Sequence, residues 1–379
     1  MSILESSVNF LTHAERPPCC LRIFRDQYVL IGTYDLDKPS GARTGSLEIR
    51  DAELILLEKY DTYSAVLDLK ISPFDDTVIA SAHSMGNLQI WQVCLNENGS
   101  FVKLRELANL QIFDTDVLIT SLHFSPSNPH CLLVTATTGE TRVIDIEHGS
   151  TSFSATQIAR QYEKVEHQHI QVQGKSTSTV AVPSRPLQHE HSLECWTAEF
   201  GTLSPIENVI FTGGDDSTIA AHDMRTGDSI WSNSRIHEAG VVAIKSSTET
   251  FRNSKPTSII TGSYDDHIRM IDLRMLGNSI YPGNNVPAAN STTLNLGGGV
   301  WRFAESPANA KSNSLDKLLV CCMYDGAKVV TVGADDEFVV DSYIKKNHDS
   351  MCYGGDWSSG FIATCSFYDK VVQIWEEPQ

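Results

Sequence analysis

The sequence predicts an all-β protein, a seven-bladed β-propeller, and internal repetition is the main reason. The segment FTGGDDSTIAAHDMR (211–225) matches ITGSYDDHIRMIDLR (260–274) position for position after a shift of 49 residues. Each copy contains a short apolar strand, a tight polar turn and a second alternating strand, which is the pattern of a β-hairpin. Apolar runs precede the hairpins and further strands follow them, so that units of four antiparallel strands recur roughly every 40 to 60 residues. Such units are the blades of a propeller.

The seven blades can be placed in order along the chain. Their starts fall near residues 19, 64, 116, 190, 237, 297 and 348. The weaker hairpins that support this assignment lie at 79–93, 134–146, 319–330 and 362–376. The last unit ends after three strands at IWEEPQ, so its fourth strand must come from elsewhere. We expect SSVNFL (6–11) to supply this strand and to close the ring with the N-terminus.

Two segments are too long and too polar for ordinary turns. Residues 150–188 are rich in Ser, Thr, Gln and His, and residues 277–293 contain Gly, Asn and Pro. Segments of this kind are typical of surface insertions. We therefore expect one propeller domain over residues 1–379 with two insertions on its surface.

Composition excludes several classes of function. The chain has 29 basic and 47 acidic residues, a net charge of -18, which is the wrong sign for a nucleic-acid partner and favours a cationic one. The N-terminus has no basic region followed by an apolar one, so we expect a cytoplasmic protein without membrane insertion. The nine cysteines form no C-x-x-C pair, which indicates reduced thiols and no metal site. We expect no cofactor.

The repeats resemble the WD-repeat family. In that family a histidine before the first strand, an aspartate in the turn after the second strand, a Ser or Thr and a Trp form a buried tetrad. Blade five carries His237, Asp265 and Ser263, with Ile271 where the Trp belongs. Serine, histidine and aspartate are also the residues of a hydrolytic triad, so both interpretations are possible. Aspartates at the equivalent turns favour the structural one; they are Asp216, Asp325 and Asp369.

One position of the innermost strands is unusual. Just after the first apolar residue stand Trp196, Trp301 and Tyr353, where blades two, three and five have Leu67, Thr120 and Val242. In a propeller this position opens on the mouth of the central channel. Three rings there, in an acidic protein, predict a site for a quaternary ammonium group through cation–π attraction. The alternative is that the rings only plug the channel.

Polar and aromatic residues surround this trio at predicted strand starts and turns on the same face. They are Glu194, Arg302, Asp356, Tyr264, His267, Tyr324 and Tyr368. His267 replaces the Thr that usually follows the tetrad aspartate. A histidine beside carboxylates can activate water, although a solvated turn histidine is the alternative.

Several blocks narrow the resemblance to the diphthine methylesterase family of WD-repeat proteins. They are HSLECWTAEF (191–200), GGDD (213–216), GSYDDHI (262–268), GGVWR (298–302), YGGDWS (353–358) and ATCSFYD (363–369). The resemblance implies hydrolysis of the methyl ester of methylated diphthine on translation elongation factor 2, before amidation completes the modified histidine. The trimethylammonium group of this substrate suits the aromatic positions.

Candidate roles follow for the residues near the channel mouth. We expect His237 or His267 to be the base, oriented by Asp265 or Asp356. Arg302, or the backbone amides of Gly298 and Gly299, would polarise the ester carbonyl. The expected substrate-binding residues are Glu194, Trp196, Trp301, Tyr353, Tyr264, Tyr324 and Tyr368.

A non-catalytic adaptor, active in docking or trafficking, is the competing interpretation, since most WD-repeat propellers are adaptors. A methyltransferase is disfavoured because no glycine-rich loop follows a strand and opens a helix. The expected partners are elongation factor 2 with its methylated diphthine and the amidating enzyme of the pathway, and we expect a monomer.

Overall fold

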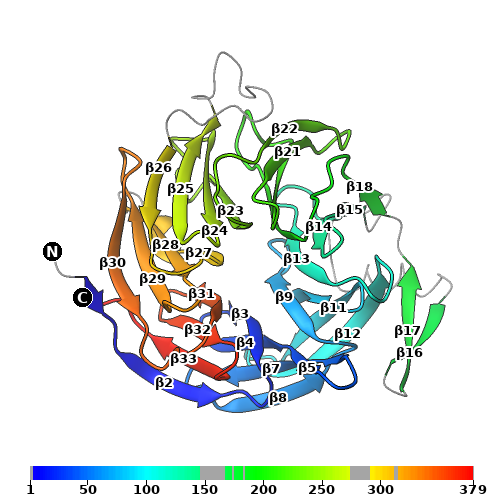
Figure 1. Cartoon of the computed structure of the whole chain (residues 1–379). Coiled ribbons are helices and arrows are strands. Elements are labelled where there is room, and N and C mark those ends of the chain that lie inside the picture. Colours follow the sequence, from blue (N-terminus) through cyan, green and yellow to red (C-terminus); the bar gives the residue numbers. More distant parts are fainter. Residues whose placement is uncertain are drawn as a thin grey trace.

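The computed structural model describes residues 3–145, 167–172, 175–181, 184–273, 291–310 and 315–378. Seven blades of four antiparallel strands each stand around a central channel, each with its first strand innermost, so the expected seven-bladed β-propeller is confirmed (Figure 1). Among the described residues no helix is long and apolar enough to cross a membrane. The nine cysteines are free thiols.

Blades one to three occupy the first half of the ring. Blade one consists of β3 (Pro18–Phe24), β4 (Tyr28–Thr33), β7 (Ser46–Asp51) and β8 (Leu56–Asp61), with a small hairpin of β5 (Asp35–Asp37) and β6 (Ala42–Thr44). Blade two consists of β9 (Val66–Ile71), β10 (Val78–His83), β11 (Asn87–Leu95) and β12 (Phe101–Gln111). Blade three consists of β13 (Ile119–Phe124), β14 (Cys131–Ala136), β15 (Thr141–Asp145) and β18 (Ser184–Pro186).

Blades four to seven complete the ring. Blade four has β19 (Cys195–Phe200), β20 (Val209–Gly214), β21 (Ile219–Asp223) and β22 (Ser229–Asn233), and blade five has β23 (Val241–Ser246), β24 (Ser258–Ser263), β25 (His267–Asp272) and β26 (Ser291–Asn295). Blade six has β27 (Arg302–Glu305), β28 (Asp316–Cys321), β29 (Ala327–Val332) and β30 (Phe338–Ile344), with the short 3₁₀ turn η2 (Pro307–Ala310) after β27. Blade seven has β31 (Cys352–Trp357), β32 (Ile362–Ser366) and β33 (Val371–Trp375).

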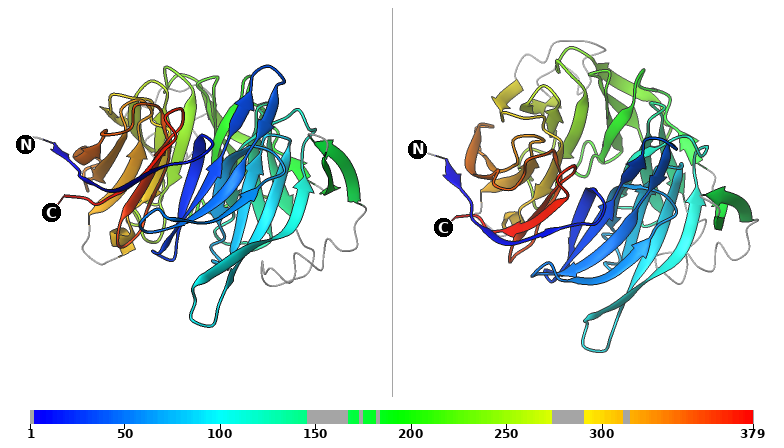
Figure 2. Two further views of the ribbon diagram at one scale, coloured as in Figure 1. Left: turned by 90° about the horizontal axis from the view of Figure 1, so that it is seen from below. Right: turned by 60° about the horizontal axis from the view of Figure 1, so that its bottom comes forward.

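The N-terminal segment closes the ring. Strand β2 (Val8–His13) pairs antiparallel with β33 as the outer strand of blade seven, with Val8 opposite Trp375 and His13 opposite Val371. The expected closure is therefore confirmed, with the strand two residues further along than SSVNFL. Before it, β1 (Leu4–Glu5) adds to blade six in parallel with β30, which the sequence analysis did not anticipate. Figure 2 shows this segment wrapping around the outside of the two blades.

The first expected insertion, 150–188, lies mostly outside the described residues. Its described parts are a hairpin of β16 (His167–Val172) and β17 (Lys175–Ala181), which joins the outer edge of β12, and strand β18 (Figure 2). Because β18 pairs with β15, the end of this segment is part of blade three rather than an insertion. The second expected insertion, 277–293, lies outside the described residues up to the start of β26.

Buried tryptophans on the outer parts of the blades differ in their polar contacts. Trp375 is fully buried, and its Nε1 donates a hydrogen bond to Thr364 Oγ1 at 3.1 Å. Trp231 is also fully buried, but its Nε1 has no hydrogen-bond partner among the described residues. The two residues therefore separate the effect of ring burial from the effect of the hydrogen bond.

We expect Trp375→Phe to lower the free energy of unfolding by about 1 kcal/mol, the net worth of a buried hydrogen bond, beyond any change caused by ring size. The matched variant Trp231→Phe removes an unpaired N–H, so it should lower the free energy of unfolding less than Trp375→Phe does. Urea unfolding of both variants measures the difference. Equal losses would contradict a stabilising role for the bond to Thr364.

Candidate functional site

β-Bulges on the innermost strands aim one side chain per blade toward the channel. Six of the seven described innermost strands contain one extra residue relative to their neighbour, and the extra residues are Cys19, Leu67, Thr120, Trp196, Val242 and Tyr353. In blade six Trp301 lies directly before β27 and donates its backbone N–H to Cys321 O at 2.9 Å. A bulge bends its strand and re-aims a side chain. The unusual aromatic position is thus the bulge position.

The structure brings the three expected aromatic residues together. The ring of Trp301 stacks on Tyr353 with 4.9 Å between centroids, and its edge contact with Trp196 is at 5.6 Å. Tyr264 joins them, stacked on Trp301 at 5.8 Å. We call these four residues the aromatic cluster. Burial raises the pKa of the Tyr264 and Tyr353 hydroxyl groups, so both remain neutral donors.

The aromatic cluster does not leave all of its rings open to a ligand. Trp301 is only 6% exposed, because the stacked rings cover it, whereas Trp196, Tyr264 and Tyr353 are half-buried. A cation approaching the cluster therefore meets the three half-buried rings. Asp215, which the sequence analysis missed, accepts a hydrogen bond from Trp196 Nε1 at 3.2 Å and supplies a negative charge beside them.

Arg302 connects the aromatic cluster to a cavity in the channel. Its guanidinium carbon lies 4.6 Å from the centroid of the Trp301 ring, and its Nη1 donates to Val242 O at 3.2 Å and to Trp301 O at 3.3 Å. Among the described carboxylates none forms an ion pair with it. Since a guanidinium has five N–H donors, part of its hydrogen-bonding capacity is available to a ligand.

The cavity has a volume of about 180 Å³ and a charged lining. Most of its charges stand three residues beyond the bulge on the innermost strands. This second position carries Arg22, Lys70, His123, Glu199, Lys245 and Asp356, with Ala304 in blade six. The cavity is lined by four cationic side chains, those of Arg22, Lys70, Lys245 and Arg302, and by the carboxylates of Asp68 and Glu199. A cation-rich cavity inside an acidic protein suits an anionic or polarised oxygen.

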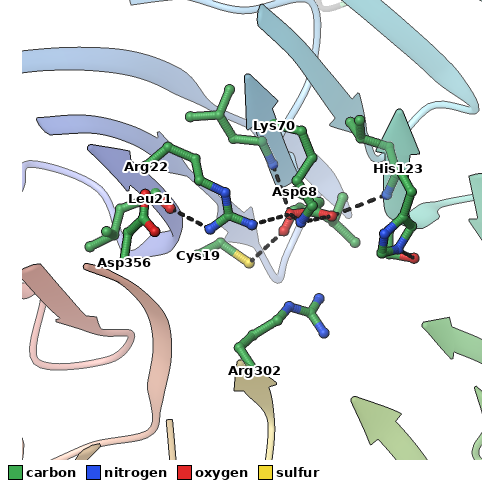
Figure 3. A network of polar contacts seen from close by, with 12 residues as sticks. Cys19, Leu21, Arg22, Asp68, Lys70, His123, Arg302 and Asp356 are labelled. Atoms are coloured by element: carbon green, nitrogen blue, oxygen red, sulfur yellow. Dashed lines mark hydrogen bonds and ion pairs between the residues drawn. The ribbon is translucent and has the colours of Figure 1, made fainter. Parts of the chain in front are cut away.

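Asp68 organises one side of this cavity. Lys70 Nζ lies 2.9 Å from both carboxylate oxygens, and the backbone N–H of Leu122 donates to Oδ2 at 3.1 Å. Burial opposes the charge, but Lys70, Arg302 and Arg22 hold the pKa of Asp68 well below its usual range. Figure 3 shows Asp68 between Arg22, Lys70 and His123, with Arg302 extending toward them from blade six. The arginine and this group thus face one space.

His237 and Asp265 belong to a buried structural network of blade five. His237 Nε2 lies 2.8 Å from Thr261 Oγ1, and burial together with Arg269 lowers the pKa of His237 to about 3. Arg269 holds both carboxylate oxygens of Asp265, at 2.8 and 2.7 Å. The tetrad hydroxyl is therefore Thr261, and the assignment of Ser263 is wrong: Ser263 Oγ instead donates to the carbonyl of Ala239 at 3.0 Å.

The same network recurs in blade seven, which supports this correction. His348 Nε2 lies 2.9 Å from Thr364 Oγ1, the hydroxyl that also accepts from Trp375. Blade four has the equivalent contacts of His191, to Thr212 Oγ1 and to Asp216 Oδ1, both at 3.0 Å. In blade five, Nδ1 of His237 has no hydrogen-bond partner among the described residues, so that network is less complete than the other two. Repetition of the histidine–threonine contact in three blades indicates scaffold.

The structure does not bring His267 and Asp356 together with Arg302 in one constellation. His267 begins β25, the third strand from the channel, and its Nδ1 lies 2.6 Å from the carbonyl oxygen of Asp265. Asp356 accepts backbone N–H groups from Ile23 at 2.8 Å and from Trp357 at 3.0 Å, and burial raises its pKa. Asp356 thus orients neither candidate histidine among the described contacts.

The remaining candidates surround the aromatic cluster. Tyr324 and Tyr368 are 61% and 67% exposed, and the ring of Tyr368 reaches the cluster through Phe367, at 5.0 Å from Tyr368 and 5.3 Å from Tyr353. Glu194 is half-buried, and its backbone carbonyl accepts the N–H of Asp215 at 2.8 Å. These residues form a partly acidic, aromatic border.

The cavity contains a histidine, His123, that is not among the site residues expected from the sequence. His123 lies with Nε2 3.3 Å from Ser121 Oγ and Nδ1 3.9 Å from Glu199 Oε2. The signal was present in the aligned innermost strands, three residues after the position that carries the aromatic residues. A polar residue stands there in six of seven blades, and in the structure all of them except Asp356 line the cavity.

Comparison with known proteins gives close relatives. No family model matches the chain. A protein of Saccharomyces cerevisiae named diphthine methyltransferase is 54% identical over 99% of this chain and 99% of its own length. Its namesake in Schizosaccharomyces pombe is 32% identical over 94% of this chain and 92% of its own length.

A chain in the crystal structure of the mitotic checkpoint complex superposes with a TM-score of 0.63 at 13% identity, over 98% of this chain and 92% of that chain. This likeness concerns the fold alone and agrees with a WD-repeat propeller. The two fungal relatives, in contrast, match almost from end to end. The chain therefore belongs to the diphthine methyltransferase family of WD-repeat propellers.

Proposed function

We propose that this protein hydrolyses the methyl ester of methylated diphthine on elongation factor 2, giving diphthine and methanol, as a late step of diphthamide biosynthesis in the cytoplasm. The observation that carries the proposal is the position of Arg302, which contacts the aromatic cluster and also lines the polar cavity. A substrate with a trimethylammonium group next to an ester carbonyl has the chemistry to engage both at once.

The electrostatics of the protein support a cationic group at the mouth and a polarised oxygen inside. A net charge of -18, with Asp215 beside Trp196, attracts the trimethylammonium group. In the cavity, available guanidinium N–H groups stabilise the negative charge that develops on the ester carbonyl when a nucleophile attacks. Hydrolysis needs no further co-reactant than water.

The name of the relatives describes transfer of a methyl group, which is a different reaction. A transferase must hold a methyl donor, and the described chain contains no strand, glycine-rich loop and helix unit of the kind that binds nucleotide-like donors. The adaptor interpretation, with docking of the amidating enzyme, requires binding without turnover.

One experiment separates the three functions. Purified protein and elongation factor 2 carrying methylated diphthine are incubated in ¹⁸O-labelled water, and methanol and the modified peptide are measured by mass spectrometry. We expect methanol release and one ¹⁸O atom in the product carboxylate, without added donor. Tight binding without methanol release would support the adaptor, and methylation that depends on an added sulfonium donor would support the transferase.

Trp196 tests the cation-binding part of the proposal. We expect Trp196→Leu to raise KM for the modified factor by about 2- to 30-fold with little change in kcat, because a cation–π contact is worth about 0.5 to 2 kcal/mol. Steady-state methanol release measures both constants. The matched variant Trp196→Phe keeps an aromatic face and should lose less; equal KM for the Leu and Phe variants would contradict a cation–π role.

A further inference from the structure

Ser121 and His123 stand on one face of β13, the innermost strand of blade three. They are two residues apart, and side chains at that spacing point to the same side of a strand. His123 Nε2 lies 3.3 Å from Ser121 Oγ, and both residues line the cavity that Arg302 lines. The distance is within reach of a proton transfer, since such contacts are often long before substrate binds.

A carboxylate stands on the other ring nitrogen of His123. Glu199, from β19 of the next blade, places Oε2 3.9 Å from Nδ1. Its Oε1 is held by the hydroxyl of Ser246 at 3.2 Å and by Lys245 Nζ at 3.5 Å. A carboxylate beside Nδ1 favours the tautomer with the proton on Nδ1, which leaves Nε2 as an acceptor for the Ser121 hydroxyl.

The neighbouring hydroxyl groups compete with His123 for the proton of Ser121. Thr120 Oγ1 donates to the carbonyl of Cys195, and Thr135 Oγ1 lies 2.7 Å from both Thr120 Oγ1 and Ser121 Oγ. The Thr120 proton is committed to a carbonyl, so Thr135 has a single proton for its two contacts. When Thr135 donates to Ser121, the Ser121 proton can point to His123, and the contact between Thr135 and Thr120 then has no proton.

His123 is neutral at physiological pH, the form that accepts a proton. Burial and the nearby Lys70 lower its pKa to about 3. The cavity of about 180 Å³ has space for roughly six waters at about 30 Å³ each, so a methyl ester group of four heavy atoms fits beside these side chains.

We propose that Ser121, His123 and Glu199 form a hydrolytic triad inside the propeller channel, with Ser121 as nucleophile, His123 as general base and Glu199 as the residue that positions His123. This proposal rests on the proposed function and deepens it. Ser121 and His123 lie two residues apart on one strand of the scaffold, and Ser121 does not stand on a strand-to-helix turn. The triad is recognised by geometry and roles, as in other hydrolases.

The reaction proceeds in two balanced steps. Ser121 Oγ bonds to the ester carbonyl carbon while His123 Nε2 takes its proton, and the resulting oxyanion faces Arg302; the C–OCH₃ bond then breaks, and the departing methoxide takes the proton from His123 and leaves as methanol. Water next attacks the acyl-serine and gives a proton to His123, and the Ser121 oxygen leaves and takes that proton from His123. The product is a carboxylic acid, which loses its proton to solvent and is released as the diphthine carboxylate. Water is the net co-reactant.

A covalent intermediate gives this proposal a direct test, because the acyl group remains attached to the protein substrate. We expect acid-quenched mixtures of the enzyme and modified elongation factor 2 to contain an ester-linked adduct of both chains on denaturing gels, sensitive to hydroxylamine. Ser121→Ala should form no adduct and lose at least 10³-fold in kcat, and His123→Gln should lose a similar factor. Ser342→Ala, which removes a buried hydroxyl on β30, should retain activity.

Glu199 has a test of its own, since it acts through His123. Glu199→Asp, which keeps a carboxylate, should recover much of the kcat that Glu199→Gln loses, at unchanged KM. If folded Ser121→Ala releases methanol at a rate within tenfold of the wild type, the triad is overturned and the esterase proposal stands. If the wild type releases no methanol, the esterase and the triad fail together.

Discussion

Acidification from pH 7.5 to below pH 5 is expected to unfold the propeller. The folded chain holds five histidines whose pKa is lowered to about 3 or 4, with desolvation as the first cause in each case. His83, His222, His237 and His348 are buried, and His123 is half-buried beside the cavity. In the unfolded chain each binds a proton below about pH 6.5. Between pH 6.5 and 4 the unfolded state therefore binds more protons, and stability falls as pH falls.

The size of this effect is comparable with the whole stability of a domain. Below pH 6.5 each such histidine lowers the free energy of unfolding by about 1.4 kcal/mol for every pH unit of acidification. Five of them lower it by at most about 7 kcal/mol per unit. Since domains are stable by about 5 to 15 kcal/mol, we expect the transition between about pH 6 and pH 4.5. His191 adds nothing there, because burial is outweighed by Cys195 and Asp216, which raise its pKa, and it is protonated in both states below pH 6.5.

Urea unfolding followed by tryptophan fluorescence at pH 7.5, 6.5 and 5.5 measures the slope. Replacing one buried histidine, as in His348→Gln, should lower stability at neutral pH and flatten the slope by about 1.4 kcal/mol per unit. The matched variant His13→Gln, on the exposed outer strand β2, should leave the slope unchanged. A wild-type stability that is constant from pH 7.5 to 5.5 would contradict five histidines that stay neutral in the folded state.

The fold could be predicted from the sequence because each blade repeats one local pattern. The closure by residues near 6–11 followed from a missing fourth strand, a topological necessity that needs no side-chain detail. The sequence did not predict that β18 belongs to blade three. Its three residues, Ser184–Pro186, carry no strand pattern of their own within a long polar segment. Pairing with β15, which is a tertiary contact, decides their structure.

The candidate site was predicted in part, for a geometric reason. Aligning the innermost strands located Trp196, Trp301 and Tyr353 because one position contained unusually large side chains. The position three residues further, where His123 and Glu199 stand, contains ordinary charged residues that resemble solvated ones. Only the closed ring shows that they share a cavity. Catalytic residues were expected in blade five because a structural tetrad and a hydrolytic triad contain the same residue types.

Replacement of Arg302 is expected to have the largest effect on turnover that does not depend on the identity of the nucleophile. Arg302→Ala should lower kcat for methanol release by about 100- to 1000-fold, the usual cost of losing one oxyanion donor. KM should change little, because the contact strengthens as charge develops on the carbonyl oxygen. Arg302→Lys keeps the positive charge but not the planar guanidinium, so its kcat should lie between that of the wild type and that of Arg302→Ala.

A chemical rescue separates this role from a structural one. Arg302 also packs on Trp301 and donates to two backbone carbonyls, so its loss alone has two explanations. Guanidinium ion at millimolar concentration should restore kcat of Arg302→Ala several-fold, because the ion occupies the vacated space beside the cavity and supplies the same N–H donors. Arg225→Ala, at an exposed site after β21, should show full activity and no response to guanidinium. Turnover by Arg302→Ala within about threefold of the wild type would remove Arg302 from the reaction, and the aromatic cluster and the cavity would then have no demonstrated chemical link.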